Sequence, residues 1–536
     1  MEKKWLILFL LIIGIGASGA AYSAETEPTS SFVKFSSSEF LTFDELLSLS
    51  KNPDPSNPLA AKLYKFWRTP IISNEAYYEG VRAPVRTDSK LGRMLRVASW
   101  NIEKSLKLKE AIGLLTDSEN FASLIDSAKA PVNSERYEKV LEQHHLLTQA
   151  DIILCQEMDI GVKRSGYVNA PLELAKALHM NYAYAPAYLE IDPAYLGTEN
   201  IVLESGTQDE EAMDFYRVDK DRYKGLFGSV VLSRYPIKSV TVFPLHNQGY
   251  DWYWGEQEKT TFFEESRRFG AKTLFQSEVH REMKVGGRNF MRVDLEVPGL
   301  PDNTLTIINI HLEIKCLPVA RAAQISEILE YIKGIQNPVI MAGDFNSAPG
   351  DLSPTSAVRE TARTLKRPTT WLTVGINAIV PQSMAVNVTR GISNVTKNFQ
   401  NPTAKSIPIV APNPSEKMFK EIENFRFDDG HAFDFRGDEK RAAGHTGLLA
   451  NANQRDRMGF KTSFQLKRTI AEVIGKYRLD WFFVKSFLID PRDENGPYRF
   501  APHFGRILEE LNTSLIQPAS DHHPGIVDLP FDEVKL

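Results

Sequence analysis

The stretch NPVIMAGDFNSAPGD, residues 337–351, carries the strongest signal in the chain. An apolar run from Val339 to Ala342 leads directly into Asp344 and Asn346. A short apolar run of this kind is typical of a buried strand, which would place the acid and the amide where the strand meets a loop. Asp and Asn also satisfy turn backbone, so the tetrapeptide GDFN alone does not separate a polar strand end from a catalytic site.

Other apolar runs meet loops at residues of the same chemical kind. Strand-like runs end at Asn101, Glu157 and His311, Asp480 begins another, and Asp521 and His522 precede a further run at 525–530. Each residue alone has an ordinary structural explanation, such as a turn, an ion pair or a satisfied core histidine. Together they indicate a site, because ligands gather outside the ends of strands in α/β sheets.

Strand-like and helix-like runs are mixed along the chain. The helix-like runs include 136–149, 171–180 and 321–335, and the strand-like runs are 95–103, 150–159, 228–237, 290–297, 304–313, 338–346, 478–486 and 525–530. This mixture predicts an α/β or α+β sheet core.

The domain boundaries follow from changes in composition. Residues 1–24 have two lysines, an apolar run and small residues, which is the order of a secretory signal peptide, with an uncleaved anchor as the alternative. Residues 25–92 read as an N-terminal extension with two short helices. Residues 93–530 form the main domain. The polar, weakly periodic run at about 354–475 reads as a long insertion.

Composition limits the classes of function. The chain of 536 residues has a net charge of −5, so bulk positive charge does not drive contact with nucleic acid. Its two cysteines, Cys155 and Cys316, make no disulfide framework, and a buried free thiol is expected at Cys155. The phosphate-binding motif GxxxxGK[ST] and the serine-hydrolase motif GxSxG are both absent from the sequence.

The ordered segments SWNIE, CQEMD, GSVVLSRYPI, NIHLEIKCLPVARAAQ, AGDFNSAP, RLDWFFV and SDHHPGIVDL resemble the endonuclease/exonuclease/phosphatase superfamily. Its members include deoxyribonuclease I, abasic-site endonucleases, bacterial sphingomyelinases and inositol polyphosphate 5-phosphatases. The resemblance runs from about Leu95 to Leu529. It implies a deoxyribonuclease I-like four-layer sandwich, in which two mixed β-sheets pack face to face with helices outside.

The resemblance also implies a divalent metal ion. Glu157 would be a direct ligand, and Asn101 and Asp521 would complete an oxygen-rich site. Hard oxygen ligands suit Mg²⁺ or Mn²⁺ better than Zn²⁺. One such site is expected, and a second remains open.

The remaining family positions imply the catalytic groups. Asp344 would orient or deprotonate the attacking water, and Asn346 would hold a phosphate oxygen. His311 would donate a hydrogen bond to the phosphate or to the leaving oxygen. Asp480 would fix the ring of His522, which would contact the scissile phosphate. Which histidine is the general acid stays open.

Four further features have weaker signals. Arg281 and Arg288 could reach a phosphate, although surface charges are the ordinary interpretation. The aromatic stretch at 250–254 could stack on a base or touch lipid, but packing is expected first. His445 could line the cleft from the insertion, and a solvated loop histidine is the alternative.

The sequence therefore predicts an exported phosphoesterase, periplasmic or secreted, that depends on a divalent metal and hydrolyses phosphodiester bonds. A nuclease is the first expectation. A phospholipid-directed enzyme of the sphingomyelinase or phosphoinositide phosphatase type is the alternative, and a relative that binds phosphate without turnover is the third. No stable protein partner is implied, and a monomer is expected.

Overall fold

The computed structural model describes residues 32–89, 91–117, 121–199, 217–257, 282–347, 415–435, 452–456, 459–470, 474–493 and 497–533. The expected signal peptide at 1–24, Arg281, His445 and most of the insertion expected at 354–475 lie outside these ranges. No helix within the ranges is long and apolar enough to cross a membrane.

The larger sheet has ten strands, of which eight follow the order β1-β2-β6-β7-β5-β4-β21-β20, with β3 paired to β4 and β9 to β6. Only β4 and β5 pair in parallel among these strands. The strands are β1 (Phe35–Ser36), β2 (Ile71–Ser73), β3 (Arg86–Asp88), β4 (Gly92–Asn101), β5 (Ile152–Ile160), β6 (Asn181–Glu190), β7 (Leu226–Ser233), β9 (Lys284–Gly286), β20 (His503–Ile507) and β21 (Gly525–Pro530).

The smaller sheet has five strands in the order β17-β12-β11-β10-β8, and only β11 and β12 are parallel. Its strands are β8 (Ile237–Pro244), β10 (Asn289–Glu296), β11 (Thr304–His311), β12 (Val339–Asp344) and β17 (Asp480–Lys485). Three two-stranded sheets pair β13 (Arg455–Asp456) with β14 (Gly459–Phe460), β15 (Phe464–Ile470) with β16 (Ile474–Tyr477), and β18 (Phe487–Leu488) with β19 (Tyr498–Arg499).

The helices lie outside the two sheets. They are α1 (Phe43–Lys51), α2 (Leu59–Phe66), α3 (Glu75–Tyr78), α4 (Leu108–Leu115), α5 (Phe121–Leu124), α6 (Glu135–Thr148), α7 (Ala170–Leu178), α9 (Trp254–Gln257), α11 (Pro318–Ile332), α15 (Glu416–Asn424) and α16 (Glu509–Thr513). Short 3-10 turns are η1 (Glu103–Ser105), η2 (Lys163–Ser165) and η3 (Pro301–Asn303).

Strand alternation gives each sheet two apolar faces. On β4, Val97 belongs to the core between the two sheets, whereas Trp100 packs under the helices. On β12, Ile340 faces the same inter-sheet core and Met341 faces the opposite helix layer. Burying each such side chain contributes about 1.5–3 kcal/mol, so the alternation stabilises both faces at once.

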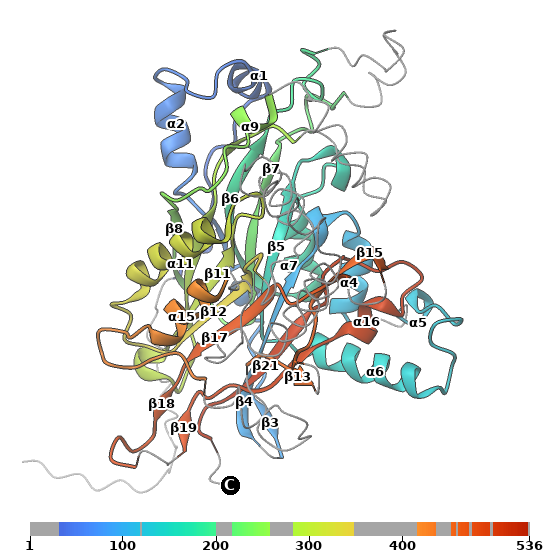
Figure 1. Ribbon diagram of the computed structural model, residues 1–536, viewed down its shortest axis with the longest axis vertical. Coiled ribbons are helices and arrows are strands. Elements are labelled where there is room, and N and C mark those ends of the chain that lie inside the picture. Colours follow the sequence, from blue (N-terminus) through green and yellow to red (C-terminus); the bar gives the residue numbers. More distant parts are fainter. Residues whose placement is uncertain are drawn as a thin grey trace, which may run out of the picture. The chain divides into compact units, whose positions relative to one another are not determined.

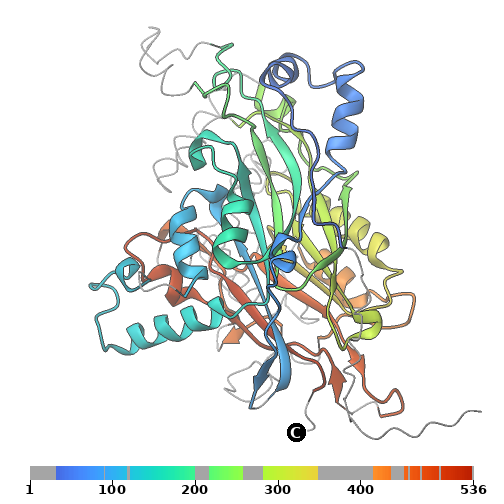
Figure 2. The same ribbon diagram turned by 180° about the vertical axis from the view of Figure 1, so that it is seen from behind.

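One helix layer covers each outer face. The helices α4, α6 and α7 pack on the larger sheet, while α11 and α15 pack on the smaller one. Figures 1 and 2 show α11 and α15 on the far side of the sheets from α6. The four-layer sandwich of two mixed sheets predicted from the sequence is therefore confirmed.

Helix α11 shows how local sequence sets these elements. Pro318 stands at its first turn, where a fixed φ suits the helix and the missing N–H costs nothing. Ile325, Ile328 and Ile332 then form one buried stripe at spacings of three and four residues. The stripe faces β11 and β12, so this helix supports the two strands that carry His311 and Asp344.

Residues 33–89, in the expected N-terminal extension, add β1 and β2 to the larger sheet through the pairing of β2 with β6. The two short helices expected there are α1 and α2. Cys155 and Cys316 are both free and buried, as expected for Cys155.

Candidate active site

Three predicted residues are neighbours across three strands of the smaller sheet. His311 pairs with Asp344 in the parallel ladder of β11 and β12. Asp344 pairs with Asp480 in the antiparallel ladder of β12 and β17. Strand register therefore brings together residues that are far apart in the sequence.

Gly343 explains why a glycine precedes Asp344. Its φ is +142°, and a Cβ atom added there would lie 2.0 Å from the carbonyl oxygen of Ile310. No side chain fits at that distance, so only glycine lets β12 approach β11 at this point. The close approach sets His311 and Asp344 side by side.

The larger sheet supplies Asn101 and Glu157. Asn101 ends β4, and its Nδ2 donates to Asp344 Oδ2 at 3.1 Å, which links the two sheets. Glu157 lies at a break in the pairing of β5 with β7, between Cys155 and Met158, and its φ is +58°. A bulge of this kind redirects a side chain, and it leaves the Glu157 carboxylate partly exposed beside His311, at 3.8 Å from Nε2.

His522 and Asp480 form a buried pair. The ring Nδ1 lies 2.9 Å from Asp480 Oδ2, and the peptide oxygen of His522 accepts a hydrogen bond from Trp100 Nε1 at 3.0 Å. Burial lowers the pKa of His522, but the Asp480 carboxylate overcomes this and raises the pKa well above its ordinary value. The ring is therefore held in its charged form, with Nε2 3.9 Å from Asp344 Oδ2.

His311 has the opposite electrostatic setting. Burial and the nearby charges of Arg288 and His522 hold the pKa of His311 well below its ordinary value. Its Nε2 lies 3.6 Å from Asp344 Oδ2. The site thus contains one neutral and one charged imidazole on either side of a carboxylate.

Asp344 is the centre of these contacts. Burial raises its pKa to about 7, with the charge of His522 acting against this shift and Asp480 adding to it. The backbone N–H of Asn346 donates to Asp344 Oδ1 at 2.8 Å, and the Asn346 side chain donates to the carbonyl of Leu312 at 3.0 Å. Asn346 has a φ of +46°, a conformation that asparagine tolerates better than most residues.

Asp521 lies among other carboxylates. Burial raises its pKa to about 7, and the charges of Glu103 and Glu157 add to the shift. A cluster of acids with this mutual repulsion suits a divalent cation with oxygen ligands. The side chains of Asn101, Glu157 and Asp521 supply such oxygens and fit the expected ion chemically. In the part of the chain that the structure describes, however, no group of three or more His, Cys, Asp or Glu side chains is already arranged to hold a metal.

Sequence reasoning missed Glu103. The charge of its carboxylate contributes to the raised pKa of Asp521, and its backbone N–H donates to Asn101 Oδ1 at 3.1 Å. The signal was available, because Glu103 is the acid two residues after Asn101 in SWNIE.

Arg288 was expected to be a surface charge, and this expectation is wrong. The side chain is only 4% exposed, and its Nε donates to Glu313 Oε2 at 3.0 Å. Its buried Nη1 has no hydrogen-bond partner, and its positive charge helps to lower the pKa of His311. A buried guanidinium nitrogen without a partner beside the site is a ready donor for an anion.

The aromatic stretch at 250–254 mostly packs, as expected. Trp252 and Tyr253 are buried, and Trp252 Nε1 donates to Glu313 Oε2 at 3.0 Å, the same oxygen that holds Arg288. Trp254 differs, because 55% of its surface is exposed.

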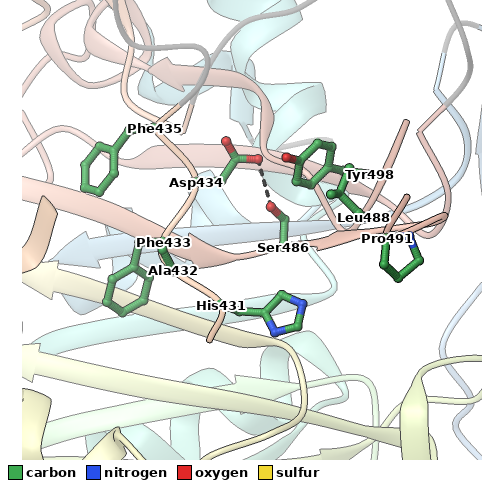
Figure 3. A pocket seen from close by; sticks show the side chains of 9 residues that line it. All are labelled: His431, Ala432, Phe433, Asp434, Phe435, Ser486, Leu488, Pro491 and Tyr498. Carbon is green, nitrogen blue, oxygen red and sulfur yellow. Dashed lines mark hydrogen bonds between the residues drawn. The ribbon is translucent and has the colours of Figure 1, made fainter. Parts of the chain in front are cut away.

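An open pocket of about 280 Å³ lies at the other end of β17, beyond Lys485 (Figure 3). Its lining includes Phe433, Phe435 and Tyr498, and Asp434 in it accepts a hydrogen bond from Ser486 Oγ at 2.9 Å. Asp480 begins the strand and the pocket follows its end, which is about 17 Å away at the usual rise per residue. None of the predicted site residues lines this pocket.

The eight predicted residues therefore lie together at one edge of the two sheets. The arrangement offers hydrogen-bond donors to an anion from His522, His311 and Arg288, and a carboxylate at Asp344 that can accept a proton. Such a set can hold an anionic group and activate a water molecule beside it.

A profile of the endonuclease/exonuclease/phosphatase family matches residues 98–522. No curated protein matches the chain. Among solved structures, an endonuclease/exonuclease/phosphatase from Beutenbergia cavernae DSM 12333 is 15% identical, with 82% of this chain and 72% of that chain covered and a TM-score of 0.35. A 3'-5' exonuclease (NExo) from Neisseria meningitidis is 12% identical, with 81% and 98% covered and a TM-score of 0.34. ANGEL2, a 2',3'-cyclic phosphatase, is also 12% identical, with 81% and 95% covered and a TM-score of 0.32.

Proposed function

The chain belongs to the endonuclease/exonuclease/phosphatase family of phosphoester hydrolases, and we propose that it is an exported phosphodiesterase that uses Mg²⁺ or Mn²⁺ to cut nucleic acid. One observation carries the proposal. Asn101, His311 and His522 converge on Asp344 Oδ2, with their nitrogens at 3.1, 3.6 and 3.9 Å. The proposed reaction is direct attack of water on phosphorus, without a covalent enzyme intermediate.

Asp344 is the proposed general base. A base works best when its pKa lies near the working pH, and burial raises the pKa of Asp344 to about 7. In the proposed step, water forms the new P–O bond and gives its proton to Asp344. The bond from phosphorus to the leaving oxygen breaks in the same displacement.

His522 is the proposed proton donor to the leaving oxygen. Its Nδ1 is held by Asp480 at 2.9 Å, which keeps the ring charged and directs Nε2 toward the site. The opposite charge states of the two imidazoles support His522 over His311 for this role. His311 instead holds the phosphate or the leaving oxygen by a hydrogen bond.

Arg288 and Asn346 are the proposed ligands of the non-bridging phosphate oxygens. The free Nη1 of Arg288 supports this assignment, and the Asn346 amide has a second N–H besides the one that it donates to the carbonyl of Leu312. Asn101, Glu157 and Asp521 would hold the divalent ion. That ion would supply charge neutralisation at the phosphate.

Nucleic acid is the favoured substrate class because of the resemblance described above. A phospholipid is the second candidate, and two observations favour it. The net charge of −5 gives no general attraction to a polyanion, and the exposed indole of Trp254 offers an anchor at a lipid surface.

The test is a metal-dependence assay on a mixed panel of substrates. The full chain is incubated with plasmid DNA, RNA, sphingomyelin, phosphoinositides and bis-p-nitrophenyl phosphate, with Mg²⁺, with Mn²⁺ or with chelator. Asp344→Ala is the test variant, and Asp490→Asn, on an exposed loop, is the control. Turnover that needs metal and is lost only in Asp344→Ala supports the proposal and identifies the substrate class. Binding without turnover under every metal would favour a non-catalytic relative.

Export is tested separately. The order of residues in 1–24 supports cleavage after Ala20, Ala21 or Ala24. N-terminal sequencing of the exported protein would find one of these new ends, whereas an intact N-terminus in the membrane fraction would favour an anchor.

A further inference from the structure

The turn η1, between Asn101 and helix α4, has an unusual backbone. Glu103, Lys104 and Ser105 have φ values of +46°, +55° and +55°. Three consecutive left-handed residues without a glycine are strained, and such strain persists only where the surroundings fix each residue. The hydrogen bonds and the ion pair that hold this turn therefore indicate which arrangement of neighbouring residues the strained backbone maintains.

Ser105 is tethered to the bulge that carries Glu157. Its Oγ donates to the carbonyl of Glu157 at 3.4 Å and accepts from the N–H of Asp159 at 3.2 Å. These two peptide groups lie on either side of Met158, where the β5–β7 ladder resumes after the break. The hydroxyl, in a side chain only 2% exposed, thus takes the place of a missing strand partner.

The other two residues of the turn are held as well. The N–H of Glu103 donates to Asn101 Oδ1 at 3.1 Å, and Lys104 forms an ion pair with Glu282. The N–H of Ile102 donates to the backbone carbonyl of Gln156 at 3.2 Å. The segment from Asn101 to Ser105 therefore lies along the bulge as a substitute strand.

We propose that Ser105 is a positioning residue that fixes the Glu157 carboxylate relative to Asn101, and so sets the affinity of the site for a divalent cation. The inference rests on the proposed function, because it takes these two residues as ligands. Without the hydroxyl, the Glu157 carbonyl and the Asp159 N–H lose their shared partner, and the bulge can relax. Groups that orient metal ligands in this way typically change metal affinity by about 10- to 100-fold.

The test measures Mn²⁺ binding by the full chain without substrate, through the loss of the electron paramagnetic resonance signal of free Mn²⁺. Ser105→Ala and Ser105→Gly both remove the hydroxyl, but glycine also relieves the backbone strain. Ser233→Ala is the matched control, because that buried hydroxyl accepts from Tyr235 N–H at 2.9 Å beside the opposite end of β5.

Both Ser105 variants should bind Mn²⁺ about 10- to 100-fold more weakly, and the control should stay within about twofold of wild type. The half-saturating Mn²⁺ concentration for turnover should rise by the same factor, with turnover restored at high metal, which loss of folding would not allow. Wild-type affinity in both Ser105 variants would overturn the inference while the proposed function stands. If the wild-type chain binds no Mn²⁺, the proposed function fails and the inference fails with it.

Discussion

Replacing Asp480 with Asn tests the assignment of charge in the His522 pair. The substitution keeps the shape of the side chain and removes the carboxylate that lies 2.9 Å from His522 Nδ1. Both side chains are buried, so solvent does not screen the loss. A hydrogen bond to a charged group is worth about 1.5–3 kcal/mol, and we expect the free energy of unfolding to fall by this amount.

The sign of the pH dependence follows from the raised pKa of His522. A raised pKa contributes stability that is fully present below the ordinary histidine value of about 6.5 and is lost as pH rises through the folded-state pKa. The difference in unfolding free energy between wild type and Asp480→Asn should therefore be largest near about pH 6 and smaller near about pH 9. Urea unfolding at both pH values measures it.

The same substitution should reduce catalysis selectively. If charged His522 protonates the leaving oxygen, loss of the His522 charge in Asp480→Asn should lower the turnover of DNA by about 10²- to 10⁴-fold. The alkaline limb of the kcat/KM profile should also move to lower pH. Bis-p-nitrophenyl phosphate has an activated leaving group that needs less protonation, so its turnover should fall less.

Asp151→Asn is the control for this experiment. Asp151 is also buried and ion-paired, with Arg86 Nε at 2.8 Å, but it precedes β5 at the end away from the site. The Asp151→Asn variant should be less stable than wild type, and its pH profile of kcat/KM should not change. An equal loss on both substrates, or an unchanged alkaline limb in Asp480→Asn, would refute the role given to His522.

Three other perturbations have definite outcomes. Gly343→Ala places a Cβ 2.0 Å from the carbonyl oxygen of Ile310 and should lower the free energy of unfolding in urea by more than about 3 kcal/mol. Gly80→Ala, with nothing within 4 Å of the added Cβ, should lower it by only about 1–2 kcal/mol because of its positive φ. Equal losses in the two variants would contradict the steric explanation. Arg288→Ala should lower kcat/KM by about 10- to 100-fold, and a free phosphate inhibitor should bind more weakly in proportion. Chelation should abolish turnover and lower the melting temperature, both restored by Mg²⁺; full activity in chelator would exclude the metal.

The sequence predicted the residues whose signal is local. Asp344 follows the apolar run Val339–Ala342, and His311 ends the largely apolar run 304–311, so both strand ends were visible before the pairing was known. The two mixed sheets and their helix layers also followed from such runs together with the family resemblance. The family profile and the observed sheets agree with that prediction.

The features that depend on distant partners could not be predicted. Arg288 follows two glycines and resembles a surface turn, but it is buried beside Glu313, which follows β11. The left-handed turn at Glu103–Ser105 contains no glycine to mark it. Strands β1 and β2 have two and three residues, too few for a period to be recognised. In each case the neighbouring element, rather than the local sequence, fixes the conformation.

The position of β21 has a consequence for when activity can arise. This strand inserts between β4 and β20, and His522 lies just before it, more than 400 residues along the chain from Asn101. The ribosome must therefore have translated the chain through His522 before the two halves of the site can meet. Pairings between such distant segments form slowly. A chain that crosses a membrane unfolded would thus pass its own cell's phosphodiesters before it became able to hydrolyse them.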